Sequence, residues 1–345
     1  MVEHEIYMQR CLQLAVLGQQ WVAPNPMVGA VIVYNNKIIG EGFHQKFGGP
    51  HAEVNAINSV VDKSLLKEST IYVSLEPCAH FGKTPPCSNL IIENQIPKVV
   101  VACLDPNPLV AGKGIALLKQ AGVAVTIGVL EQEAKSLNKR FYCYFEKKRP
   151  FISLKWAQSL DEFCGVFNTS KKITNWYSDI KVHQLRSSEQ AILVGFNTAQ
   201  IDNPKLNIRN WFGKNPIRVV IDLEGKLSSN LNIFNDGGIT LVFTSNPKKD
   251  SEFVSYIQVV ENIALPNQIV LNLYERKIQS ILIEGGPKTL QLFIDHNLWD
   301  EAHVFTSSKK LGAGINAPNI SNFDEVFNQK LLNDSYSILI PQKHL

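Results

Sequence analysis

Short hydrophobic runs alternate with helix-like segments through the first half of the chain. The runs are rich in β-branched residues and are bounded by turn-forming residues, which predicts buried strands. The predicted strands are residues 28–34, 70–75, 98–103 and 123–127. The predicted helices between them are residues 51–60, 88–95 and 113–121. Strands that alternate with helices in this way indicate a sheet covered by helices.

The second half has the same style with different spacing, so it is not a copy of the first. Its predicted strands are residues 151–157, 190–195, 216–222, 239–244, 255–260, 280–284, 301–306 and 335–340. Its predicted helices are residues 176–187 and 287–297. A basic cluster and Pro150 interrupt the pattern within residues 139–150, which favours a short connector there. We therefore expect two α/β domains, residues 1–146 and 147–345.

Length and composition narrow the class of protein. The chain has 345 residues, of which 45% are hydrophobic and 19% are charged, as in a globular protein of two domains. The formal net charge of +3 excludes a highly basic nucleic-acid coat protein. No run approaches the ~18–20 apolar residues of a membrane-spanning helix, and the first residues do not resemble a signal peptide. We expect a cytoplasmic protein that binds neither nucleic acid nor membrane.

The cysteines carry the strongest chemical signal. Six cysteines are too few for a disulfide scaffold in this chain, and closely spaced cysteines in a reducing compartment suggest a metal. Cys78 and Cys87 are separated by eight residues, and His51 precedes them. One imidazole and two thiolates suit zinc, which accepts nitrogen and sulfur in a tetrahedral shell. Three protein ligands leave a fourth position for water, which zinc converts into a nucleophile near neutral pH.

Glu53 is the candidate acid–base residue beside this metal site. It follows His51 by two residues, so both side chains reach the same cavity from the first turn of a helix. An H-x-E motif followed by P-C-x-x-C is the signature of zinc nucleobase deaminases, and here the second cysteine is farther away. The alternatives are a structural zinc site closed by His80 and a chance coincidence.

Four segments resemble the deaminase half of the bifunctional riboflavin-biosynthesis deaminase–reductase family. They are PNPMVGAVIV (24–33), GPHAEVNA (49–56), SLEPCAHFGKTPPCSNL (74–90) and DPNPLVAGKG (105–114). The wide gap between the cysteines is that family's pattern. The resemblance implies a cytidine-deaminase-like α/β/α fold and Zn²⁺. It also implies a phosphorylated substrate, 2,5-diamino-6-ribosylamino-4(3H)-pyrimidinone 5′-phosphate.

The same resemblance assigns substrate contacts to Asn25, His44 and Lys83. A lysine between the zinc cysteines suits a phosphorylated substrate. Each position also has a plainer interpretation. Asn25 precedes Pro26 and is typical of a turn, His44 is compatible with a packed or surface histidine, and Lys83 with an exposed loop lysine.

The second half would not be identified from composition alone. It has no G-x-G-x-x-G motif, so a standard dinucleotide site is not indicated. Residues 282–291 (LIEGGPKTLQ) instead predict a strand, an acidic residue, two glycines and a helix start, a weak signal for phosphate binding. The alternative is an ordinary helix start after a strand.

Three further segments resemble the reductase half of the same family. They are residues 153–161, 185–209 and 281–286, so the resemblance spans about residues 3–315 in the same domain order. It implies a dihydrofolate-reductase-like fold that uses NADPH to reduce the ribosyl group to ribityl. The implied cofactor contacts are Ala157, Thr198, Asp202, Gly286, Pro287, Lys288, Thr289, Leu290, Gln291 and Leu292. The implied substrate contacts are Lys155, Ser170, Arg186, Leu206, Arg209 and Glu284.

Some of these contact residues also have a plainer structural interpretation, and two other residues differ from the family's usual pattern. Arginines suit a sugar phosphate, although Arg186 and Arg209 are also compatible with surface salt bridges. Asp202 is also compatible with a turn cap. Glu162 stands where the family usually has glycine, and Lys172 where it has an aromatic residue that stacks near the nicotinamide.

Three functions remain to be distinguished. The leading hypothesis is a bifunctional deaminase–reductase, which we expect to be a homo-oligomer. The second is a zinc deaminase with a degenerate, non-catalytic second domain. The third is a nucleic-acid deaminase, which the near-neutral charge and the absence of a basic-aromatic stripe disfavour.

Overall fold

A computed structural model describes residues 2–79, 85–108, 110–167 and 172–342 of the chain. Two compact units share these residues, Met1–Lys148 and Arg149–Leu345. The division lies two residues beyond the expected boundary at 146. Among the described residues, no helix is both long and apolar enough to span a membrane.

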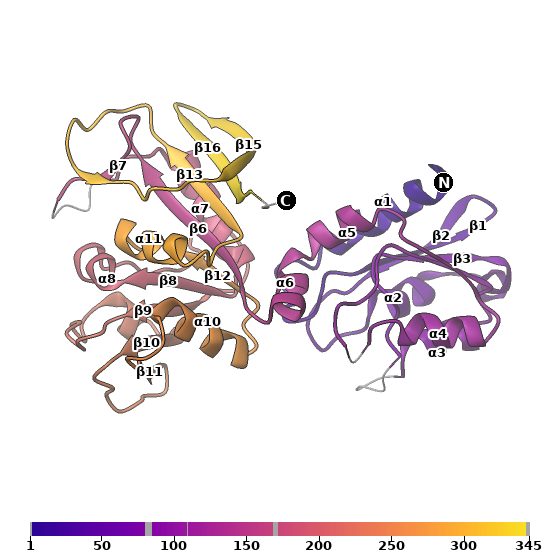
Figure 1. Cartoon of the computed structure of the whole chain (residues 1–345). Helices are drawn as coiled ribbons and strands as arrows, with labels where there is room; N and C mark the ends of the chain where they lie inside the picture. Colours follow the sequence, from indigo (N-terminus) through magenta and orange to yellow (C-terminus); the bar gives the residue numbers. More distant parts are fainter. Residues whose placement is uncertain (1, 80–84, 109, 168–171, 343–345) are drawn as a thin grey trace. The chain divides into compact units, whose positions relative to one another are not determined.

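The first unit is built on a five-stranded sheet in the order β2-β1-β3-β4-β5 (Figure 1). Its strands are β1 (Gly29–Tyr34), β2 (Lys37–Phe43), β3 (Thr70–Val73), β4 (Lys98–Val101) and β5 (Ala124–Ile127). Strand β1 is antiparallel to both β2 and β3, whereas β3, β4 and β5 run parallel. The carboxyl ends of β3 and β4 therefore meet at one edge of the sheet.

Helices cover both faces of this sheet. They are α1 (Val2–Val16), α2 (Ala52–Ser59), η1 (Lys63–Glu68), α3 (Cys87–Glu93), α4 (Lys113–Gln120), α5 (Glu131–Leu137) and α6 (Lys139–Lys147). The alternation along β1 separates the two cores: Ala30 and Ile32 pack under α2, α3 and α4, and Val31 and Val33 pack under α1, α5 and α6. The unit is thus the expected three-layer α/β/α domain.

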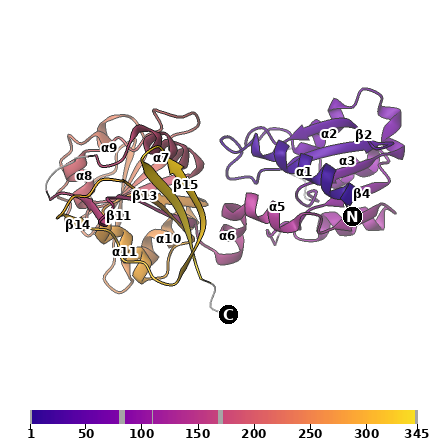
Figure 2. The ribbon, with the colours of Figure 1, turned by 90° about the horizontal axis from the view of Figure 1, so that it is seen from above.

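The second unit contains a nine-stranded sheet in the order β11-β10-β9-β8-β12-β6-β13-β16-β15 (Figures 1 and 2). Its strands are β6 (Phe151–Gln158), β8 (Ala191–Gly195), β9 (Ile217–Ile221), β10 (Thr240–Thr244), β11 (Val254–Gln258), β12 (Ser280–Ile283), β13 (Glu301–Thr306), β15 (Phe323–Leu331) and β16 (Asp334–Pro341). Strands β6 and β8 to β13 run parallel, and β16 is antiparallel to both of its neighbours, β13 and β15. The short strands β7 (Phe163–Gly165) and β14 (Ile315–Asn316) pair with each other.

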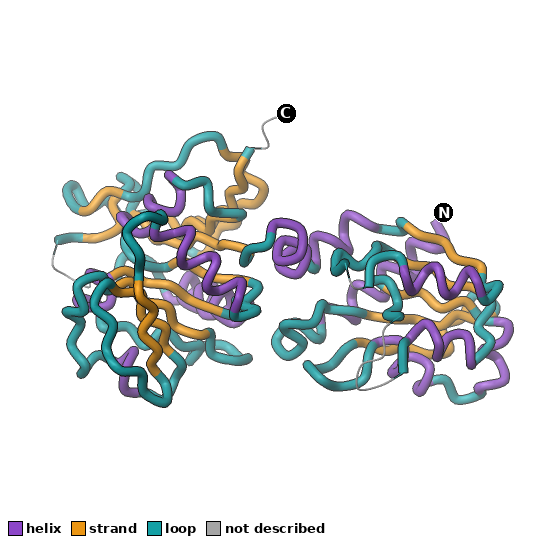
Figure 3. Tube along the Cα trace, turned by 60° about the horizontal axis from the view of Figure 1, so that its bottom comes forward, coloured by secondary structure: helices purple, strands orange, loops and turns teal. Residues whose placement is uncertain are grey.

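Helices also cover both faces of the second sheet, as the secondary-structure colouring of Figure 3 makes visible. They are α7 (Trp176–Ser188), α8 (Phe196–Asp202), α9 (Asn232–Asn235), α10 (Leu265–Glu275) and α11 (Pro287–Asp295). Helices α10 and α11 share one core with Ile152 and Leu154 of β6, and α7, α8 and α9 share the other with Ile192 and Val194 of β8. The carboxyl ends of β6, β8 and β12 lie side by side because these strands are parallel neighbours.

All predicted strands and helices are present, although several elements were not predicted. The unpredicted elements include α1, β2, α5, α8, α10 and β15. The connector expected over residues 139–150 is wrong for most of its length, because residues 139–147 form α6. Its Phe141 and Tyr142 pack in the core of the first unit, so the basic residues lie on the polar face of an amphipathic helix.

Candidate active sites

The zinc donors of the first unit lie at the ends of secondary-structure elements. His51 is the residue immediately before α2, Cys78 lies in the loop after β3, and Cys87 is the first residue of α3. One ligand atom from each residue lies within 4.8 Å of the others. The three residues that the sequence singled out are therefore brought together, and no other such cluster of three was found among the described residues.

The spacing of the donor atoms fits a tetrahedral zinc ion. The Nδ1 atom of His51 lies 3.6 Å from Cys78 Sγ and 3.3 Å from Cys87 Sγ. Zinc–sulfur bonds of about 2.3 Å and zinc–nitrogen bonds of about 2.0–2.1 Å at tetrahedral angles place such atoms about 3.5 Å apart. Nδ1 is therefore the nitrogen of His51 that faces the metal position.

The thiol groups of Cys78 and Cys87 shift each other's pKa in opposite directions, and this arrangement also suits a bound cation. The pKa of Cys78 is held well below that of an ordinary thiol, first by its hydrogen bond with the Cys87 thiol and then by His51. The pKa of Cys87 is raised, first by the same hydrogen bond and then by burial. Two thiolates this close repel each other, so a divalent ion stabilises the form in which both are ionised.

Glu53 lies in the first turn of α2 and is 3% exposed. Burial raises the pKa of Glu53 to about 7, and the nearby charge of His51 opposes this rise. A carboxyl group with that pKa both accepts and releases protons near neutral pH. A zinc ion held by His51, Cys78 and Cys87 would add positive charge nearby and lower this pKa.

His44 and Asn25 form a pair beside His51. The imidazole Nδ1 of His44 lies 2.9 Å from the carbonyl oxygen of Pro50, which only accepts, so Nδ1 carries the proton. Its Nε2 atom then accepts from the Asn25 amide at 3.0 Å. Burial lowers the pKa of His44, which favours this neutral form. Lys83 and His80 lie outside the described residues.

The second unit holds a buried cluster of charges at the carboxyl ends of its strands. Arg186 of α7 donates to both carboxylate oxygens of Glu284 at 2.7 and 2.8 Å. Lys155 of β6 lies 3.9 Å from the same carboxylate. Burial alone would raise the pKa of Glu284, but the charges of Arg186 and Lys155 outweigh it and lower that pKa to about 2. Arg186 is therefore not a surface salt-bridge residue.

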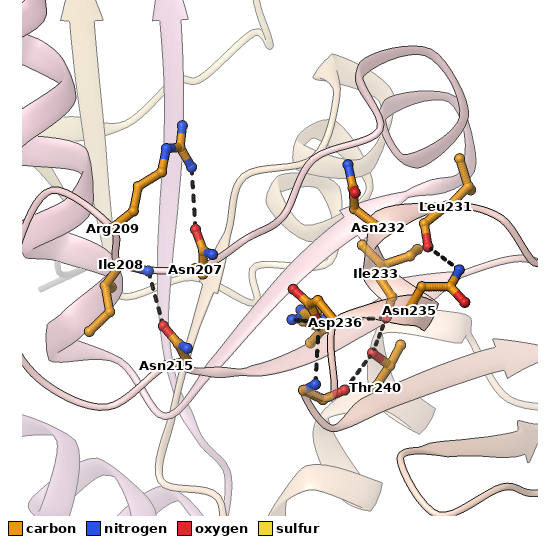
Figure 4. A network of polar contacts seen from close by, with 12 residues as sticks. Asn207, Ile208, Arg209, Asn215, Leu231, Asn232, Ile233, Asn235, Asp236 and Thr240 are labelled. Atoms are coloured by element: carbon orange, nitrogen blue, oxygen red, sulfur yellow. Dashed lines mark hydrogen bonds and ion pairs between the residues drawn. The ribbon is translucent and has the colours of Figure 1, made fainter.

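A cavity of about 310 Å³ adjoins this cluster. Five residues assigned from the family resemblance line it, namely Lys155, Ala157, Arg186, Asp202 and Arg209. The Arg209 side chain lies near the side-chain oxygen of Asn207 at 3.3 Å, and the neighbouring Ile208 amide is held by Asn215 (Figure 4). Lys172 also lines the cavity, where it forms an ion pair with Asp179.

Two strand–helix turns approach each other closely at the same edge. A side chain at Gly195, which ends β8, would collide with Thr289 Oγ1 at 2.3 Å. Gly285 has the same constraint, because a Cβ atom there would lie 2.4 Å from Val194 Cα. Gly286 has a φ of +39° and lies next to Thr198, so Thr198, Gly286 and Thr289 come together at the start of α11. The positive end of the α11 dipole lies at this helix start, which suits a cofactor phosphate.

Other assigned residues lie differently. Leu206 and Leu290 are 2% and 1% exposed, and their side chains pack in the two cores of the unit. Pro287 is the first residue of α11, and Lys288 after it is exposed. Gln291 exchanges hydrogen bonds with the backbone of Asn319, and Leu292 is half-buried. Ser170 lies outside the described residues.

His183 is a further residue of this cavity, and no sequence motif singled it out. It lines the cavity from α7, is 3% exposed, and its Nδ1 atom has no hydrogen-bond partner among the described residues. Burial and the charges of Arg186 and Arg209 lower the pKa of His183 to about 4, so the imidazole is neutral. The available signal was its position three residues before Arg186, which places both on one face of the helix.

Comparisons with known proteins support both units. Residues 1–103 match the family model of the cytidine and deoxycytidylate deaminase zinc-binding region, and residues 150–333 match that of the RibD C-terminal domain. The riboflavin biosynthesis protein RibD of Aquifex aeolicus is 40% identical over 316 residues, which cover 90% of this chain and 88% of that protein. RibD of Bacillus amyloliquefaciens is 39% identical over 327 residues, 92% of this chain and 87% of that protein.

Solved structures agree over nearly the whole length. The structure of RibD from Acinetobacter baumannii has a TM-score of 0.91 and 33% identity, with 99% of each chain covered. A Thermotoga maritima structure has a TM-score of 0.90 and 39% identity, again covering 99% of each chain. It is described as a diaminohydroxyphosphoribosylaminopyrimidine deaminase/5-amino-6-(5-phosphoribosylamino)uracil reductase. With matches in both units, the chain belongs to the RibD family of bifunctional deaminase–reductases of riboflavin biosynthesis.

Proposed function

We propose that this chain catalyses two steps of riboflavin biosynthesis. The first is the hydrolytic deamination of 2,5-diamino-6-ribosylamino-4(3H)-pyrimidinone 5′-phosphate at the site of His51, Cys78 and Cys87. The second is the NADPH-dependent reduction of the ribosyl chain to ribityl in the cavity of the second unit. The observation that carries this proposal is the tetrahedral donor spacing beside buried Glu53, on a chain whose second unit holds a charged cavity.

In the first unit, the chain's own residues handle the proton. Zinc, when bound by His51, Cys78 and Cys87, activates water as a nucleophile near neutral pH. The Glu53 carboxylate takes a proton from the attacking water and gives it to the departing amine nitrogen. Burial raises the pKa of Glu53 and the bound metal opposes that rise, so the carboxylate can accept the proton and then release it. A neutral His44, held by Pro50 and Asn25, presents the Asn25 amide to the substrate.

Lys83, in the segment between the cysteines, contacts the substrate phosphate in this proposal. The assignment rests on its place in the family motif and on the attraction between an ammonium group and a phosphate. Asn25 and His44 bind the pyrimidine, and their contact with each other and near His51 supports this.

In the second unit, the chain's residues hold the two reactants together. NADPH, when bound, supplies the reducing equivalents, and the close turns around Gly195 and Gly286 accommodate its phosphates. Asp202 and Ala157 face the cofactor from the cavity wall. Arg209 binds the substrate phosphate, because its guanidinium lies at the cavity and is not fixed by a carboxylate among the described residues. Lys155 and Glu284 lie beneath, where they contact the sugar.

A second copy of the chain is the expected partner. Strand β15 is one of the two outer strands of the nine-stranded sheet, and its Val326 and Phe327 are exposed to 53% and 41%. A long exposed edge with apolar side chains is a template for pairing with another chain. We place the reactions in the cytoplasm, a reducing compartment in which Cys78 and Cys87 stay available as zinc ligands.

The proposal is tested by incubating the purified chain with the diaminopyrimidine nucleotide, with and without NADPH, and analysing the products by mass spectrometry. Without NADPH, we expect only the deaminated ribosyl compound, and with NADPH the ribityl compound. Deaminated product that is never reduced would instead support a degenerate second domain. A starting nucleotide that stays unchanged would contradict the deaminase assignment.

A further inference from the structure

Glu76 is a buried carboxylate that the proposed chemistry does not use. It lies two residues before Cys78 and is 4% exposed. Both of its oxygens are occupied by backbone donors from another part of the chain. Oε1 accepts from Gly114 at 3.0 Å and from Ile115 at 3.3 Å, and Oε2 accepts from Gly112 at 2.9 Å and from Asp105 at 3.3 Å. Four donors from residues 105–115 thus converge on one side chain.

The backbone of residues 105–115 allows this close contact with Glu76 because of two glycines. Gly112 precedes α4 with a left-handed φ of +74°, which turns the following N–H groups toward the carboxylate. Gly114 lies against Pro77, and a Cβ atom there would lie only 1.9 Å from the carbonyl oxygen of Pro77. The start of α4 also favours a negative charge through its free N–H groups. The glycines of DPNPLVAGKG therefore allow this segment to touch the residues before Cys78.

Helix α3 holds Cys78 from its other side. The backbone N–H of Cys87 donates to Cys78 Sγ at 3.3 Å. Ser88 donates to the carbonyl oxygen of Cys78 through its backbone N–H at 3.2 Å and its hydroxyl at 2.9 Å. The peptide from Glu76 to Cys78 is therefore fixed between the starts of two helices. Only Pro77 separates Glu76 from the zinc ligand Cys78, so a shift of Glu76 would also move Cys78.

We propose that Glu76 is a positioning residue for the zinc ligand Cys78. By collecting the N–H groups of residues 105–115 it fixes the distance of Cys78 Sγ from His51 and Cys87, and thereby sets how tightly the site holds its metal. This inference rests on the zinc site of the proposed function. Outer partners of metal ligands typically change metal affinity by about 10–100-fold, and a carboxylate with four donors has that capacity.

The test compares Glu76→Gln with Glu41→Gln in the full chain. The amide introduced by Glu76→Gln would turn an NH₂ group toward two of the four donors, so the segment would lose half of its acceptors. Glu41 gives a matched control, because its carboxylate binds Arg10 and lies outside the metal cluster. We expect Glu76→Gln to release zinc to a chromogenic chelator about 10–100-fold faster than wild type, and Glu41→Gln to match wild type.

Two further measurements separate positioning from a general role in stability. We expect kcat for deamination to fall in Glu76→Gln with little change in KM, while NADPH-dependent reduction, which occurs in the other unit, is retained. After cobalt substitution, the thiolate-to-cobalt absorption bands of Glu76→Gln should shift. Gly114→Ala keeps the carboxylate but pushes against Pro77, so it should change the same quantities in the same direction.

Each outcome decides the inference. Wild-type zinc release and cobalt spectra in folded Glu76→Gln and Gly114→Ala would overturn it. Loss of the folded first unit in both variants, with reduction intact, would also overturn it, because Glu76 would then serve folding alone. Wild-type protein that binds no zinc would contradict the proposed function instead, and is measured separately by metal analysis.

Discussion

The two units use the same layered architecture but assemble their sites in opposite ways. The zinc site takes its donors and its acid–base residue from two short segments, residues 51–53 and 78–87. The buried charge cluster beside the cavity of the second unit joins Lys155, Arg186 and Glu284, which lie as much as 129 positions apart in the chain. The first arrangement depends mainly on local turns. The charge cluster of the second unit forms only after β6, β8 and β12 have become neighbours in the folded sheet.

This difference predicts different consequences of mutation. A change at the zinc site affects chemistry while leaving the sheet intact, because the donors lie at the ends of elements. A change in the buried cluster of the second unit affects stability as well as binding, because ions left without partners in the interior are costly. The predictions below test that contrast, from the largest expected effect to the smallest.

Glu53→Gln should reduce deamination by about 10²–10⁴-fold, the usual contribution of a general acid–base residue. It should keep its zinc, because Glu53 is not among the metal donors. Deamination rate and metal content are measured on the same preparation, with Glu41→Gln as the matched control. Normal deamination by Glu53→Gln would refute the proton-transfer role.

Glu284→Gln should destabilise the second unit by about 3–5 kcal/mol, because it leaves Arg186 and Lys155 as buried charges. The measurement is unfolding in urea followed by the fluorescence of the second unit's tryptophans, because Glu284 is also assigned to the substrate and activity would mix the two effects. The same substitution at Glu224, an exposed residue paired with Lys226, should cost less than about 1 kcal/mol. Equal effects of the two substitutions would contradict the buried-cluster account.

The pH dependence of the second unit's stability follows from the ion pair of Glu284 with Arg186. The pKa of Glu284 is about 2 in the folded chain, below its ordinary value of 4.5, so its ionised form favours folding. That contribution is complete above pH ~4.5 and is lost as the pH falls toward 2. Glu284→Gln should therefore lose less stability than wild type over this range. A parallel decline of both proteins in acid unfolding would argue against the assignment.

Arg209→Ala should weaken substrate binding by about 1.5–3 kcal/mol, the range for a charge-assisted hydrogen bond, with kcat less affected. This corresponds to a rise in KM of roughly 10–150-fold. Arg276→Ala is the control, since Arg276 contacts only Asn272 of α10 among the interactions described. An unchanged KM for the phosphorylated substrate would remove Arg209 from the phosphate site.

Lys172→Trp should have the smallest effect. The ion pair of Lys172 with Asp179 is exposed and contributes little, so its loss is tolerated. A ring at this cavity position would add about 0.5–1.5 kcal/mol of stacking with the cofactor, which tightens NADPH binding several-fold. Fluorescence titration with NADPH measures this change in the affinity for the cofactor. Weaker binding by the variant would show that the lysine itself supports the cofactor.

The sequence predicted the parts of the molecule that depend on local pattern. Short runs of β-branched apolar residues located the strands, and His51, Cys78 and Cys87 predicted a cluster of metal donors that the structure forms. Lys155, Arg186 and Glu284 were assigned only by resemblance. They lie on β6, on α7 and directly after β12, and no sequence pattern predicts that these three elements meet. Helix α6 was missed because its basic residues outweigh Phe141 and Tyr142 when it is judged by composition. Glu76 was not predicted, because the backbone groups that donate to it lie 29 to 39 positions further along the chain and reach it only after folding.

The central claim is that two independently built sites act in sequence on one chain. NADPH oxidation, followed with two alternative substrates in wild type and in Glu53→Gln, tests it most directly. Wild type should oxidise NADPH with either the diaminopyrimidine nucleotide or the deaminated intermediate. Glu53→Gln should respond only to the intermediate. Absence of oxidation by wild type with the intermediate would contradict the account, as would oxidation by Glu53→Gln at the wild-type rate with the diaminopyrimidine nucleotide.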